Sequence, residues 1–146
     1  MANEEFKRFI KKFGQLKVFT EDQVSRIMAK NKDNIEDANV DQMYEDGENV
    51  GGASLGEYTL FTKIQKRKKG QKTDHITLRD TGAFQKSIKL KANSKLRYDL
   101  IATDLKKEKL EKRFGKLTGL NEENLNRLRN ILIRELKTSI DQFLKA

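Results

Sequence analysis

Asp80, Thr81 and Gly82 form Asp-Thr-Gly, the tripeptide that aspartic proteases carry in their active site. In those enzymes two aspartates in a dry loop share one proton. Arg79 precedes the aspartate here, and a guanidinium in that place would hold both carboxylates ionised. The alternative is a structural turn, in which the Asp80 and Thr81 side chains accept backbone N–H bonds and Gly82 relaxes the backbone. We expect this turn to place Phe84 in the core. A dimeric aspartic protease is the remote alternative to the structural turn.

Other residues with catalytic or metal-binding chemistry are sparse. The chain has no cysteine and one histidine, His75, which excludes disulfides, thiol catalysis and a zinc site of several imidazoles. Asp74 can orient the imidazole, but the sequence places no serine or cysteine nucleophile, so we expect a surface or turn histidine. The glycine-rich stretch 47–56 lacks the Gly-Lys-Ser/Thr of a phosphate-binding loop. We therefore expect no enzyme, no cofactor and no metal.

Positive charge is concentrated in the middle of the chain. Of the net +9, residues 1–62 contribute −4 (8 Lys/Arg against 12 Asp/Glu), residues 63–116 contribute +12 (18 against 6) and residues 117–146 contribute +1 (5 against 4). Such a field implies an anionic partner, either nucleic acid or an acidic protein surface. The alternative is that the basic residues belong to a solvated loop that contacts no partner. The candidate contacts in residues 63–72 are Lys63, Lys66, Arg67, Lys68, Lys69 and Lys72.

Apolar residues at helical spacing predict a first helix over about 4–18. Phe6, Phe9 and Phe13 lie on one face of this helix, with lysines opposite. The three rings either complete the core against the last helix or dock on a neighbouring subunit. Because they stand at a chain end behind Gly14, we assign them to an oligomer interface.

Capping signals and apolar spacing predict two longer helices. The sequence TEDQ at 20–23 is a capping box, which predicts a helix from about 21 to 44 with an interruption of its apolar stripe at Asn31. Asn121 caps a last helix over about 122–145, and acidic residues in the first turn of that helix suit its dipole.

Alternating apolar residues predict a β-hairpin over about 87–103. Asp104 then caps a short helix over about 105–114. Residues 45–75 contain five glycines and no clean period, which predicts a long loop. The expected fold class is α+β, with a small antiparallel sheet packed with N- and C-terminal helices and the glycine- and lysine-rich loop between them. We expect a single domain, 1–146.

The composition suits an elongated protein, or one that gains stability by assembling. Apolar residues make up 36% of the chain and charged residues another 36%, which predicts a thin core and a large polar surface. No apolar run approaches the roughly 20 residues of a membrane span. The N-terminus, MANEEFKRFIKKF, lacks the continuous apolar stretch of a signal peptide, and the absence of cysteine fits a protein made in the cytoplasm.

Four motifs follow one another in the central region. They are a glycine turn after a long helix, Leu-x-x-Tyr-x-x-x-Thr, Lys-Gly in a lysine-rich segment, and Leu-x-Asp-Thr-Gly-x-Phe-x-x-Ser. The residues are Gly47; Leu55, Tyr58 and Thr62; Lys69 and Gly70; and Leu78, Asp80, Thr81, Gly82, Phe84 and Ser87. This order, with the hairpin after it, resembles the tailed-phage virion-morphogenesis and tail-completion proteins, which join head to tail. Lys112 and Arg113 stand where that family often has His-Glu, so head–tail joining, tail-end capping and a tail-barrel ring all stay open.

The resemblance implies a structural virion protein without catalytic residues, which forms a homo-oligomeric ring at the neck or tail. It implies a structural motif made by Asp80, Thr81, Gly82, Phe84 and Ser87. The implied partners are copies of the chain, other neck, portal or tail proteins, and phage DNA in the channel. No membrane or small-molecule substrate is implied. A nucleic-acid-binding domain that uses 63–72 is the alternative from another class.

Overall fold

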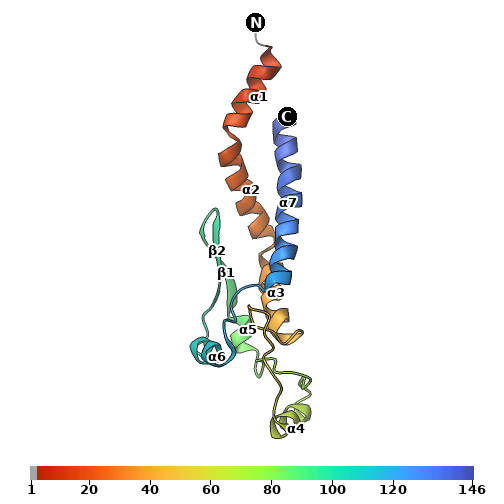
Figure 1. Cartoon of the computed structure of the whole chain (residues 1–146). Coiled ribbons are helices and arrows are strands. Elements are labelled where there is room, and N and C mark those ends of the chain that lie inside the picture. Colours follow the sequence, from red (N-terminus) through yellow and green to blue (C-terminus); the bar gives the residue numbers. More distant parts are fainter. Residues whose placement is uncertain (1–2) are drawn as a thin grey trace.

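The computed structural model describes residues 3–146, which form an elongated molecule (Figure 1). Seven helices and one two-stranded antiparallel sheet occur in this range, so the predicted α+β class is confirmed. The elements are α1 (Glu4–Gly14), α2 (Leu16–Lys30), α3 (Lys32–Tyr44), α4 (Leu60–Lys68), α5 (Ala83–Lys86), β1 (Ile88–Ser94), β2 (Arg97–Ala102), α6 (Lys107–Phe114) and α7 (Glu122–Lys145).

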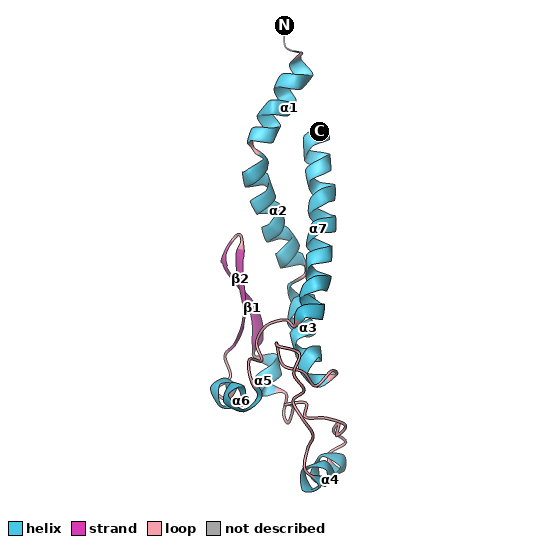
Figure 2. Cartoon of the chain, in the orientation of Figure 1, coloured by secondary structure: helices cyan, strands magenta, loops and turns pink. Residues whose placement is uncertain are grey.

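The molecule has two regions, which are visible in Figures 1 and 2. The arm consists of α1, α2 and α7; α7 runs antiparallel to α1 and α2, and both termini lie at its free end. The base consists of residues 32–121, with the hairpin rising beside α2. In the arm Phe19 stacks on Phe143, with ring centroids 4.1 Å apart. At the hairpin tip Lys95 pairs with Asp22 of α2.

The predicted helix over 21–44 is wrong at its start and is divided in the middle. Helix α2 already begins at Leu16, and the N–H of Phe19 donates to the carbonyl of Gln15 in the helical pattern. Thr20 therefore lies inside α2 and does not cap it. The division comes at Asn31, whose side-chain amide donates to the carbonyl of Ile27 over 2.8 Å. An asparagine side chain that competes for a helical carbonyl disturbs the local backbone, and the helix resumes as α3.

The hairpin and the last helix agree with their predictions. Leu90 of β1 lies opposite Leu100 of β2 in the antiparallel register. The side chain of Asn121 accepts the N–H of Asn124 over 3.0 Å, which begins α7 as a side-chain cap does. Helix α6 begins later than predicted, at Lys107.

Buried residues gather in the base and at its junction with the arm. The main cluster contains Met43, Leu55, Ile76, Phe84, Ile88 and Leu117. The cluster at the junction contains Met28, Ile35 and Leu120. Two fully buried polar side chains of α3 fix the segment before α7: Asn39 donates to the carbonyl of Leu117 over 2.8 Å, and Gln42 accepts the N–H of Asn121 over 2.7 Å. These bonds set the position at which α7 leaves the base.

Candidate interaction site

The Asp-Thr-Gly tripeptide forms the turn that precedes α5. Gly82 has φ +83°, in the left-handed region that favours glycine. The N–H of Ala83 donates to Oγ1 of Thr81 over 3.3 Å, and Phe84 is buried in the core. A β-carbon on Gly82 would come no closer than 3.6 Å to another residue, at Nε of Arg79. Glycine is therefore needed here for its backbone conformation rather than for space.

Ser87 ties this turn and helix to the exit of the hairpin. Its hydroxyl donates to the carbonyl of Phe84 over 2.7 Å and accepts the N–H of Asp104 over 3.2 Å. Because Asp104 follows β2 closely, one hydroxyl fixes the chain at both ends of the hairpin.

Asp80 contacts the lysine-rich segment rather than the backbone of its own turn. Its side chain is 66% exposed, and Oδ1 lies 3.5 Å from Nζ of Lys69, whose charge lowers the pKa of Asp80. The expected backbone N–H bonds to this carboxylate are absent in residues 3–146, and Lys69 reaches it from across the loop instead. The carbonyl of Asp80 accepts instead from the side chain of Gln71, over 3.0 Å. An exposed carboxylate beside a lysine lacks the dry setting that a shared proton needs, which favours the turn over the protease.

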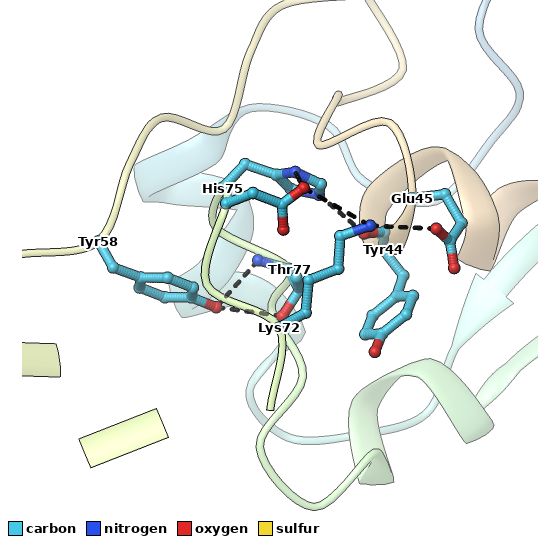
Figure 3. Close-up of polar contacts among 7 residues, drawn as sticks. Tyr44, Glu45, Tyr58, Lys72, His75 and Thr77 are labelled. Atoms are coloured by element: carbon cyan, nitrogen blue, oxygen red, sulfur yellow. Dashed lines mark hydrogen bonds and ion pairs between the residues drawn. The ribbon is translucent and has the colours of Figure 1, made fainter. Parts of the chain in front are cut away.

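Tyr58 fastens the far end of the long loop (Figure 3). Its hydroxyl lies 3.1 Å from Oγ1 of Thr77 and accepts the N–H of Thr77 over 2.9 Å. The side-chain amide of Gln85 donates to the carbonyl of Thr77, also over 2.9 Å. Because Thr77 is buried, these bonds satisfy polar groups that water does not reach. Nothing in the sequence marks this contact, since Tyr58 and Thr77 are 19 residues apart.

Lys72 and His75 fasten the same loop to the end of α3 (Figure 3). Nζ of Lys72 lies 3.1 Å from Oε2 of Glu45 and 5.6 Å from the centre of the Tyr44 ring. Nε2 of His75 lies 2.7 Å from the carbonyl oxygen of Tyr44. A β-carbon on Gly47 would stand 2.5 Å from the imidazole, so the ring packs directly against the turn after α3. These contacts support the interpretation of His75 as a turn histidine.

Helix α4 lies inside the segment predicted as a loop, so that prediction is wrong for residues 60–68. The hydroxyl of Thr59 accepts the N–H of Thr62 over 3.3 Å and caps the first turn. The last turn carries basic residues, which suit the negative end of the helix dipole.

Four of the six cations in residues 63–72 contact other parts of the chain. The contacts are Lys63 with Glu57, Lys66 with the carbonyl of Arg79, Lys69 with Asp80, and Lys72 with Glu45. Arg67 and Lys68 are exposed and make no ion pair within residues 3–146. Internal pairing therefore leaves these two as the members of the segment best placed to meet an external anion.

A hollow of about 370 Å³ lies between α4, the Asp-Thr-Gly turn and α6. Its apolar lining includes Ile76, Phe84 and Phe114. Its charged lining consists of Lys66, Arg79, Lys106 and Arg113 against Glu57 and Asp80. The excess of cations suits an acidic partner surface.

Phe6, Phe9 and Phe13 face solvent on α1. Their exposed fractions are 58%, 43% and 57%, and the rings of Phe9 and Phe13 lie 6.1 Å apart. The exposure of the three rings in the single chain argues against the core alternative. It supports their assignment to an interface between subunits.

A second exposed apolar group lies on α4, at the opposite end of the molecule from α1 (Figure 1). Leu60, Phe61 and Ile64 are all exposed, and Phe61 reaches 72%. The neighbouring run of cations hides the helical spacing of these residues in the sequence, where nothing else marks them as a surface.

Within residues 3–146, no helix is both long enough and apolar enough to span a membrane. No protein-family model, curated protein or solved structure matches this chain.

Proposed function

We propose that this chain is a structural, non-enzymatic protein of a tailed-phage virion, and that copies of it form a ring at the neck or tail. The observation that carries the proposal is the exposure of apolar side chains on α1 and on α4, at opposite ends of an elongated chain. Two different surfaces that both lack a partner favour a heterologous contact, which repeats until the ring closes.

The motif residues behind the family resemblance support the proposal through the roles they have. Leu55 and Phe84 lie in the core, Tyr58 holds the loop, and Gly82 makes the turn. All four position segments of the base and leave the outer surface for contacts with other subunits. Neck, portal or tail proteins would then bind the outer faces of the ring.

Electron microscopy of the purified chain, with sedimentation velocity on the same sample, tests the proposal. We expect annular particles of one size, whose mass is a fixed multiple of the chain mass over at least a tenfold dilution. Particles that remain monomeric at every concentration would contradict the ring, as would open filaments of variable length.

Nucleic-acid binding is the second candidate, because Arg67 and Lys68 are exposed and make no ion pair in the described chain. Two phosphate contacts predict a slope of about −1.8 in a plot of log affinity against log salt concentration. Replacing Arg67 and Lys68 by serine should abolish that slope if they bind duplex DNA. Replacing Lys109 and Lys112 of α6 is the matched control. Unchanged DNA binding in the Arg67/Lys68 variant would remove this candidate for the segment.

A further inference from the structure

A groove runs between α3 and the N-terminal half of α7. It consists of two adjoining hollows, of about 160 and 330 Å³, which share Asn34, Ala38, Asn124 and Arg127 in their linings. The smaller hollow is almost entirely apolar, and its floor is formed by Ile35, Ala38, Leu120, Leu128 and Ile131. The larger hollow opens beside it toward a rim formed by Asp37, Asp41 and Asp46. The site is therefore an apolar groove with one acidic edge, and Arg127, the cation that lines both hollows, pairs with Glu123.

The acidic edge is unusual in a chain whose net charge is +9. Asp33, Asp37 and Asp41 of α3 and Glu45, its C-cap residue, recur every four residues, where like charges repel one another, and Asp37 and Asp41 line the groove. Within residues 3–146 the three aspartates of this row make no ion pair, and Glu45 pairs with Lys72. Burial and the charges of Asp37, Glu45 and Asp46 raise the pKa of Asp41. A cationic partner would relieve this repulsion.

Helix α1 has the complementary surface. Phe6, Phe9 and Phe13 form its exposed apolar stripe, and the helix also carries Lys7, Arg8, Lys11 and Lys12. Its 11 residues span about 16 Å, which is close to the length of α3 between Asn31 and Gln42, the stretch that lines the two hollows. Amphipathic helices bind apolar grooves in this way, with the apolar stripe down and the charges at the rim.

The α1 helix of the same chain lies at the free end of the arm, away from α3 (Figure 1). We propose that α1 of one copy docks in the α3–α7 groove of the next copy, with its phenylalanines on the apolar floor and its lysines along the acidic edge. This inference rests on the proposed ring and specifies its repeating contact: α1 meets the α3–α7 groove rather than the exposed residues of α4. Because the two surfaces differ, each copy both gives and receives a helix, as a closed heterologous ring requires.

Charge reversal on each side tests the pairing. The arm variant is Lys7→Glu with Lys11→Glu, and the groove variant is Asp37→Lys with Asp41→Lys. Lysines at 37 and 41 stand four residues from Asp33 and Glu45, so the reversed α3 gains attractive pairs and remains helical. The matched control is Glu108→Lys with Asp141→Lys, two exposed acidic residues outside the groove that make no ion pair in the described residues. Circular dichroism checks the fold of each variant, and sedimentation velocity measures assembly.

We expect each variant alone to assemble at least tenfold more weakly than the wild-type chain, and the control to assemble normally. An equimolar mixture of the arm and groove variants should assemble again with the two variants alternating, because each arm then meets a groove of opposite charge. All four reversals in one chain should restore the ring. Wild-type assembly by the groove variant would overturn this inference and leave the proposed ring standing, whereas a wild-type chain that never assembles would overturn both. A groove variant that forms rings but fails to bind another virion protein would assign the groove to that protein instead.

Discussion

The base and the arm bury their apolar residues to different extents. In the base, Met43, Ile88 and Leu117 are fully buried, and side-chain hydrogen bonds hold the loops around them. In the arm, neither α1 nor α7 contains a buried residue, although α7 has 24 residues and a long apolar face. The base therefore owes its stability to its own contacts, while the arm presents apolar surface that a single chain leaves uncovered. On the proposed function, the base provides most of the folding stability, and assembly uses the exposed apolar surface of the arm together with that of α4.

The largest difference in stability is expected between two phenylalanine-to-alanine changes, one in the base and one in the arm. Phe84→Ala removes a buried ring of the base, and such changes lower the free energy of unfolding by about 3–5 kcal/mol. Phe6→Ala removes an exposed ring of the arm and should change it by less than about 0.5 kcal/mol. Urea denaturation at a concentration that keeps the chain monomeric measures both. Similar losses at the two positions would show that the arm is part of the monomer's core.

Tyr58→Phe tests the polar contacts of the base. Without the hydroxyl, the buried N–H of Thr77 loses its acceptor, which should cost about 1–3 kcal/mol. Tyr44→Phe is the matched control, since the Tyr44 hydroxyl makes no hydrogen bond within residues 3–146, and it should change stability by less than about 0.5 kcal/mol. Thermal unfolding of both variants distinguishes them, and equal melting temperatures would mean that the Tyr58 contact contributes nothing.

Gly82→Val tests the Asp-Thr-Gly turn. A β-branched residue at φ +83° is strained, so the free energy of unfolding should fall by more than about 1 kcal/mol. Asp80→Asn should have a mild effect, because this carboxylate is exposed and its partner is a single lysine. A Gly82→Val chain as stable as the wild-type chain would contradict the structural role of the turn. An Asp80→Asn chain that loses a peptide-cleaving activity would revive the protease.

Glu36 predicts a smaller effect that depends on pH. Burial acts to raise its pKa, but hydrogen bonds from Lys32 and the N–H of Leu90, with the charge of Lys89, lower it overall. A carboxyl whose pKa is lower in the folded chain stabilises it above the ordinary value, 4.5, and loses that contribution as pH falls through the lowered pKa. Stability should therefore fall less steeply below pH 4.5 in Glu36→Gln than in the wild-type chain. Identical acid profiles in urea titrations would contradict this assignment.

The elements that follow directly from the sequence are those with strong local signals. Helix α7 has both an asparagine cap and a long apolar period, and the hairpin has two alternating runs. Helix α4 was obscured because four consecutive cations follow its apolar residues, although Thr59 offered a cap. The capping box at 20–23 predicts a helix start at the wrong place, because the same residue types are also tolerated inside a helix. There the apolar period, rather than the capping residues, indicates how far the helix extends.

The interaction surfaces are harder to predict, for a physical reason. The exposure of Phe6 depends on where α7 ends relative to α1, and the groove beside α3 depends on how Asn39 and Gln42 position the segment before α7. Both are long-range arrangements that leave no periodic trace. The pairing of Lys69 with Asp80 is also a long-range contact that the sequence does not reveal. It partly neutralises the run of cations in the lysine-rich segment.

Removing residues 1–14 tests most directly whether the arm serves assembly and the base serves folding. Sedimentation velocity gives the mass of the truncated and full-length chains, and circular dichroism gives their helix content. We predict that the full-length chain forms a ring, while the truncated chain keeps the helical signal of its remaining residues and sediments as a monomer. A truncated chain that unfolds or aggregates would contradict this account, because the phenylalanines would then belong to the core. So would one that assembles as tightly as the full-length chain.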